Sequence, residues 1–152
     1  MKYKYIYPPN ARHQEQLDIM LNMEAADKDP LALENIDQDA QKILFHTKHW
    51  HVSENRYPRE GSEISFLVVA MDPIYEIDDI SPEMWLDLQQ VWQKLVREYH
   101  IDGGGICMRF GNPAKSGASL TRLHVHIIMP KDNEKVRFPV GGHKELKESL
   151  HL

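Results

Sequence analysis

An alternating run at residues 120–129, Leu-Thr-Arg-Leu-His-Val-His-Ile-Ile-Met, constrains the fold more than any other part of the chain. Successive side chains of an extended strand point to opposite faces. His124 and His126 therefore share one face, and Val125 and Ile127 share the other. One face can join an apolar core, while the other presents two imidazoles that titrate near neutral pH. The run predicts a sheet with an apolar side and a side equipped for chemistry.

The residues just before this run are small. Gly117, Ala118 and Ser119 form a stretch whose backbone can approach a ligand closely, because little side chain stands in the way. A small-residue loop that leads into a strand with paired histidines predicts a site that handles phosphate.

Length and composition set broad limits on the class of protein. The 152 residues suffice for one domain with a substantial core. The formal net charge of −5 gives no reason to expect binding to nucleic acid or to an anionic membrane. Cys107 is the only cysteine, so neither an internal disulfide nor a cysteine-rich zinc site is expected. The first residues lack the apolar core of a signal peptide, and we therefore expect a soluble, cytoplasmic protein.

Periodicity and turn signals predict an α+β fold with a mainly antiparallel sheet. Ser81-Pro82-Glu83 marks a helix start, with Ser as the N-cap and Pro at the first helical position. The predicted helices cover residues 12–26 and 81–99, with a short one at 144–150, and the predicted strands cover 43–47, 50–53, 64–71, 106–110 and 120–129.

These segments together resemble the histidine triad (HIT) family, specifically its bacterial branch of small nucleotide-processing proteins. The family motif is His-x-His-x-His followed by two apolar residues, after a Gly-x-Ser/Thr turn. Here residues 122–128 and 117–119 occupy those places. Residues 50–58 resemble the family's nucleoside-binding strand and loop, residues 66–69 its core strand and residues 81–99 its long helix.

The resemblance implies a single HIT-like α+β domain over residues 1–152, with a five-stranded sheet and a long helix. Its core spans residues 43–130, preceded by an N-terminal helical extension over residues 1–40 and followed by a tail over 131–152. Relatives pair into two-fold dimers, so a homodimer is expected. Met84, Leu88 and Trp92 offer a candidate dimer surface, although burial of that face within a monomer is equally compatible.

The chain departs from the family pattern in three places. Arg122 stands where the motif has its first histidine. Ser65 and Pro73 stand where relatives often carry histidines. Residues 29–32, Asp-Pro-Leu-Ala, lie where some relatives place a Cys-x-x-Cys half of a zinc site, so that site is expected to be lost.

The resemblance assigns the nucleophile to His124. In the family the middle histidine attacks the α-phosphorus of a nucleotide and forms a transient nucleotidyl-histidine, which water hydrolyses. One ring nitrogen must face phosphorus while the other donates a hydrogen bond that fixes the tautomer. A backbone carbonyl two residues earlier can accept that bond whatever its side chain, so Arg122 is expected to preserve catalysis and to offer its guanidinium to the phosphates.

The remaining site residues also follow from the resemblance. His126 resembles the third triad member, which contacts a non-bridging oxygen or protonates the leaving group. Ser119, with the backbone amides near Gly117, is expected to stabilise charge on the phosphoryl oxygens. Asn112 is expected near the phosphates and Asn55 at the ribose. The scheme needs no metal or other cofactor.

Each of these residues also has a purely structural interpretation. A pair of histidines on a strand is not rare, and Arg122 is equally well explained as an exposed charge on a sheet. Ser119, Asn112 and Asn55 also suit turns.

Three functions are compatible with the sequence. The first is a nucleotidyl hydrolase or transferase acting on a purine nucleotide conjugate, either a phosphoramidate, a dinucleoside polyphosphate or an adenylated small molecule. The second is a nucleotide-binding module that has lost turnover. The third is a metal-binding protein, for which His46, His49 and His51 form a second cluster.

Overall fold

The fold is known from a computed structural model that describes residues 2–152. It confirms the α+β prediction and the five-stranded antiparallel sheet, whose strand order is β1-β2-β3-β5-β4. The strands are β1 (Ile43–His46), β2 (Trp50–Glu54), β3 (Ser62–Ala70), β4 (Gly105–Arg109) and β5 (His124–Pro130). The helices are α1 (Gln14–Ala25), α2 (Pro82–Glu98) and α3 (Pro113–Ser116), with short 3₁₀ turns η1 (Pro8–Asn10), η2 (Leu33–Asn35) and η3 (Ile77–Asp79).

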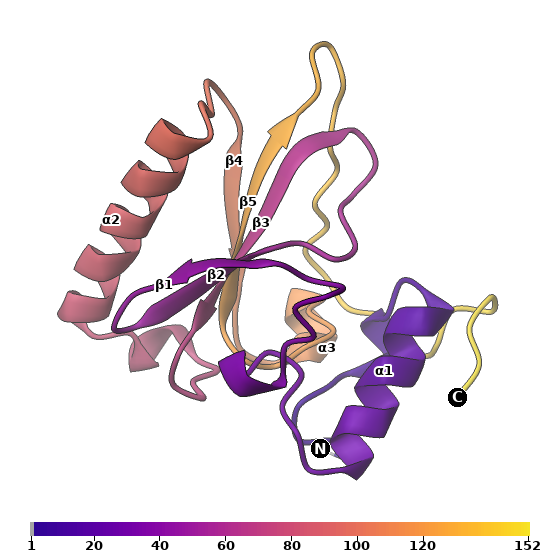
Figure 1. The fold of residues 1–152 in the computed structure, drawn as a ribbon. Coiled ribbons are helices and arrows are strands. Elements are labelled where there is room, and N and C mark those ends of the chain that lie inside the picture. Colours follow the sequence, from indigo (N-terminus) through magenta and orange to yellow (C-terminus); the bar gives the residue numbers. More distant parts are fainter. Residues whose placement is uncertain (1) are drawn as a thin grey trace.

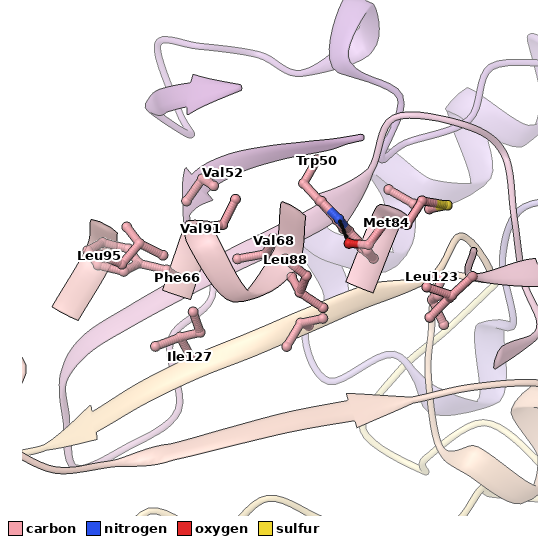
Figure 2. Packing of buried hydrophobic residues seen from close by; sticks show 13 residues of the cluster. Trp50, Val52, Phe66, Val68, Met84, Leu88, Val91, Leu95, Leu123 and Ile127 are labelled. Atoms are coloured by element: carbon pink, nitrogen blue, oxygen red, sulfur yellow. Dashed lines mark hydrogen bonds between the residues drawn. The ribbon is translucent and has the colours of Figure 1, made fainter. Parts of the chain in front are cut away.

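The long helix α2 covers one face of the sheet (Figure 1). It begins as predicted, because the Ser81 hydroxyl accepts a hydrogen bond from the Met84 N–H and Pro82 occupies the first turn. Its buried face contributes Met84, Leu88, Val91 and Leu95 to the main core (Figure 2).

The sheet supplies the other half of this core with the side chains that alternate toward α2. The indole N–H of Trp50 donates to the Met84 carbonyl at 2.9 Å and ties β2 to the helix (Figure 2). Of the three residues considered as a dimer surface, Met84 and Leu88 are buried inside the chain and Trp92 is partly buried against the same core. The strand residues of this cluster are Trp50, Val52, Phe66, Val68, Ala70, Val125 and Ile127.

The N-terminal segment, α1 and the C-terminal tail gather on the opposite side of the sheet (Figure 1). Ile6 forms an isolated antiparallel bridge with Leu120, which anchors the first residues to the segment before β5. Leu31 packs on Leu67 and Val69 of β3. The sheet is thus covered on one face by α2 and on the other face by segments from both ends of the chain.

Most predicted elements match the observed bounds to within two residues, and two predicted elements differ more. Strand β5 begins at His124 rather than at residue 120, because the Leu123 N–H donates to Ile74 and residues 121–123 form no ladder. Residues 144–150 contain no helix. Leu146 and Leu150 instead pack on Leu17 of α1 in an irregular conformation. Within residues 2–152, we find no helix with the length and apolar character that crossing a membrane requires.

Candidate functional site

The two histidines of β5 lie on the sheet face opposite α2, as the alternation predicts. His124 pairs with Val69 of β3 and with Arg109 of β4. His126 pairs with Leu67 and Cys107 one step along. Both histidines line a pocket between the sheet and the N-terminal layer.

His124 is held by its own backbone. Its Nδ1 lies 2.7 Å from the carbonyl oxygen of Arg122, which is the hydrogen bond expected from a carbonyl two residues earlier. A carbonyl only accepts, so Nδ1 carries the proton and the lone pair remains on Nε2. Burial lowers the pKa of His124 to about 4, and the nearby charge of Arg109 adds to the shift. The ring is therefore neutral at pH 7.

His126 is almost fully buried beside it, with the two ring centroids 5.1 Å apart. Burial places the pKa of His126 well below its ordinary value, and His124 and three arginines reinforce the effect. Its Nε2 has no hydrogen-bond partner within residues 2–152. The ring of Phe138, from the tail, packs edge-on against His126 with centroids 4.8 Å apart.

Arg122 does not face the pocket, which corrects the prediction that its guanidinium meets the phosphates. Its Nε donates to the carboxylate of Asp29 at 2.8 Å, and both side chains are buried. Its Nη1 donates to the carbonyls of Ala70 and Met71, where β3 ends. The guanidinium lies on the histidine side of the sheet, but it is occupied by internal partners because Asp29 and the carbonyls at the end of β3 are within its reach.

The loop before β5 meets the predictions only in part. Ser119 lines the pocket. The Gly117 N–H donates to the Pro113 carbonyl, so this amide is not free for a phosphate. Gly117 has a positive φ of 88° and ends α3. Asn112 is exposed and caps α3 by accepting from the Ala114 N–H, which corrects its expected place near the phosphates.

Asn55, the residue predicted at the ribose, lies in the pocket wall. Its amide is already engaged, because Oδ1 accepts from the Tyr57 N–H and Nδ2 donates to the Ser65 hydroxyl. One amide hydrogen remains for a ligand. Ser65, one of the departures from the family pattern, therefore positions Asn55.

The rest of the pocket combines apolar and basic side chains. The apolar ones come from α1, the segment after it, β3 and the loop before β5, and are Ile19, Met20, Met23, Leu31, Ile36, Leu67 and Leu120. Arg12, Arg59 and Arg109 add positive charge beside the two histidines. A planar base and an anionic ester are the chemistry that such a mixed lining suits.

Sequence reasoning missed these three arginines. The signal for Arg109 was present, since it lies within the strand predicted at 106–110 and the antiparallel neighbour of that strand is the histidine strand. Arg12 and Arg59 reach the site from the segment before α1 and from the β2–β3 loop, and only the tertiary fold brings them there.

The second histidine cluster does not assemble. His51 is buried and its Nε2 lies 2.9 Å from the Leu31 carbonyl, whereas His46 on β1 is exposed. No group of three or more His, Cys, Asp or Glu side chains arranged to hold a metal occurs in the part of the chain that the structure describes.

Comparison with known proteins agrees with this architecture. A family model described as the HIT domain matches residues 36–133, which is more than half of the chain, so the protein belongs to the HIT domain family. The predicted resemblance is confirmed at this level. A search of curated proteins gives no match.

Solved structures share the fold at low sequence identity. A HIT family hydrolase from Legionella pneumophila matches with a TM-score of 0.55 and 15% identity, over 74% of this chain and 96% of that one. A histidine triad protein from Clostridium difficile gives 0.53 and 18%, over 71% and 92%. The diadenosine triphosphate hydrolase of Plasmodium falciparum gives 0.52 and 19%, over 68% of each chain. At these identities the likeness establishes the fold alone.

Proposed function

We propose that this protein is a nucleotidyl hydrolase or transferase that cleaves purine nucleotide conjugates at the α-phosphate. The observation that carries the proposal is the state of His124, a neutral ring in a pocket wall with its tautomer fixed by the Arg122 carbonyl. Such a ring has a lone pair on Nε2 at pH 7 without prior deprotonation.

The reaction proceeds in two steps. His124 Nε2 attacks the α-phosphorus, a new N–P bond forms, and the leaving group departs with the electron pair of its bond to phosphorus, an amine also taking up a proton from solvent. Water or another acceptor then attacks the same phosphorus and gives up its proton to solvent, and the N–P electron pair returns to Nε2. His126 donates its ring N–H to a non-bridging oxygen, and Ser119 contributes its hydroxyl to the developing charge. No metal or cofactor takes part in this scheme.

The apolar part of the pocket takes the base, and Asn55 contacts the ribose. Arg122 supports turnover through its backbone carbonyl and its pairing with Asp29, which holds the residue in place. The phosphate contacts that the sequence assigned to Arg122 pass to the arginines of the pocket, while Gly117 shapes the loop by its positive φ.

A second candidate is a nucleotide-binding module without turnover. One observation favours it, namely the packing of Phe138 against His126, which leaves one side of that ring covered. In this case the same pocket binds a nucleotide and releases it unchanged.

The test is to mix the protein with adenosine phosphoramidate, quench in alkaline denaturant and measure the intact mass. We expect an adenylyl adduct that maps to His124 and disappears in His124→Gln. The matched control is His46→Gln, which removes an exposed histidine of β1 and keeps the adduct. Tight nucleotide binding with neither adduct nor product would favour the binding module.

We further propose that the chain forms a single domain and works in the reducing cytoplasm as a homodimer. Its partner is a nucleotide substrate, and neither nucleic acid nor a membrane takes part. Trp85, Leu86 and Val96 of α2 are exposed large apolar side chains on the side away from the core. Light scattering during gel filtration measures the oligomeric state, and a monomer at working concentration would contradict the dimer.

A further inference from the structure

Three arginines from distant segments converge beside the histidines. Arg12 precedes α1, Arg59 belongs to the β2–β3 loop and Arg109 ends β4, and all three line the pocket of His124. Arg109 is also the residue that pairs with His124 across β4 and β5. The three guanidiniums therefore share one pocket with the histidines, and their charges act on His126.

None of the three forms an ion pair within residues 2–152, although the chain neutralises other arginines. Arg122 pairs with Asp29 and Arg56 pairs with Glu15. In contrast, within the described residues the Arg12 guanidinium donates only to the Tyr57 carbonyl, and that of Arg109 only to the carbonyls of Gly117 and Pro139. The Arg109 Nε is buried with no partner at all in the described chain.

Like charges held this close repel each other. Burial lowers the pKa of both Arg12 and Arg109 to about 10, and in each case the neighbouring positive charge of Arg59 adds to the effect. An arrangement of this kind costs stability unless an anion neutralises it. Arg109 Nε and His126 Nε2 are buried without a partner in the described chain, so each can still form a hydrogen bond with a bound ligand.

The basic region continues away from the histidines. A second hollow shares Arg12 and Arg59 with the first pocket and adds Lys135 and Arg137 from the tail. Glu60 and Glu134 also line it, so its cations exceed its carboxylates by two. Phe138 packs at the junction, with the guanidinium carbons of Arg59 and Arg109 4.9 and 4.6 Å from its ring centre. The ring holds both arginines toward the site.

We propose that Arg12, Arg59 and Arg109 form a subsite for a phosphate chain, so that the leaving group is an oligophosphate rather than a neutral amine. The inference rests on the proposed function for its place in the reaction. When the α-phosphorus bond breaks, negative charge develops on the departing oxygen, and guanidiniums stabilise it without a proton donor. The second hollow then takes phosphates further along the chain, where Lys135 and Arg137 meet them.

The first experiment measures binding of inorganic tripolyphosphate by calorimetry and needs no turnover. We expect binding that weakens with added salt and falls at least about tenfold in each of Arg12→Gln, Arg59→Gln and Arg109→Gln. Arg97→Gln is the matched control, since it removes the same charge from the exposed surface of α2. Absence of binding, or equal binding by all variants, would overturn the subsite.

The second experiment compares kcat/KM for diadenosine tetraphosphate and for adenosine phosphoramidate. We expect Arg109→Gln to lower kcat/KM for diadenosine tetraphosphate at least about tenfold more than kcat/KM for adenosine phosphoramidate. The reason is that only diadenosine tetraphosphate has an oligophosphate leaving group. A loss equal for both substrates would overturn the leaving-group assignment. Binding of tripolyphosphate without turnover of either substrate would instead reject the proposed reaction and keep the anion subsite.

Discussion

The two faces of the sheet are made by the same strands but have opposite characters. The face toward α2 is a continuous apolar core, with Trp50, Val68 and Val125 fully buried. The other face buries His51, His124 and His126 beside a buried ion pair. Three buried polar atoms on this second face have no partner in the described chain, namely His51 Nδ1, Arg109 Nε and His126 Nε2, whereas the core under α2 has one beside it, Trp92 Nε1. The first face stabilises the fold, whereas the second keeps binding capacity at a cost in stability.

The largest effect on stability is expected at the ion pair of the second face. Arg122→Ala leaves Asp29 buried without a counter-charge, and we expect the free energy of unfolding to fall by about 3–5 kcal/mol in urea titration. The double variant Arg122→Leu with Asp29→Leu should lose less than either single change. Lys4→Ala, which breaks an exposed pair with Asp27, is the control and should leave stability unchanged. A loss under about 1 kcal/mol for Arg122→Ala would show that the pair does not fix this face.

The apolar face predicts a loss of stability without a loss of chemistry. Leu88→Ala creates a cavity under α2 and should cost about 2–5 kcal/mol, because the side chain is fully buried. Its kcat, measured where the variant is still folded, should stay within about twofold of the original. Leu86→Ala removes an exposed leucine from the same helix and should change stability by less than about 0.5 kcal/mol. A large fall in kcat for Leu88→Ala would mean that the two faces are not independent.

The histidines of the second face predict a dependence of stability on pH. The folded-state pKa of His124 is about 4, below the ordinary 6.5. The unfolded chain therefore binds the extra proton first, and stability falls as pH drops from about 6.5 toward 4. For this one group we expect a loss of about 2 kcal/mol between pH 7 and pH 5. Denaturant titrations should give His124→Gln a flatter profile and His46→Gln the original one, and identical profiles for both variants would contradict this account.

The smallest effect is a gain. His126 is buried with Nε2 unpartnered, so His126→Leu should raise the free energy of unfolding by about 1 kcal/mol while turnover falls. His126→Asn, which keeps a polar group there, should not stabilise the protein. Thermal melting measures the stability and initial rates measure the turnover. If His126→Leu were less stable than the original protein, the packing of the imidazole would contribute more than its unpartnered Nε2 costs.

The sequence predicted those parts of the site that follow from local periodicity. Alternation placed His124 and His126 on one face, and spacing along the backbone anticipated the carbonyl of Arg122 as the partner of His124. The same alternation gives the face of the Arg122 side chain, but it carries no information on the partners that occupy the guanidinium there. Its partner Asp29 lies 93 positions away in the sequence, and no local pattern can predict a contact over that separation.

The ends of the chain were the least predictable region. The helix predicted at 144–150 is too short to be stable alone, and contacts of Leu150 with Ala11 and Leu17 hold the segment in another shape. The approach of Phe138 to His126 likewise depends on the path of the whole tail. These contacts are tertiary, so periodicity carries no signal for them.

The pairing of Asp29 with Arg122 has a consequence for how the sequence of this protein can diverge. Either residue changed alone leaves a lone charge in the interior, whereas a joint change to two apolar residues is tolerable. Descendants of this chain should therefore exchange the two positions together or retain both. Position 29 belongs to the N-terminal segment and position 122 precedes the histidine strand, so inheritance of that segment is tied to inheritance of the strand.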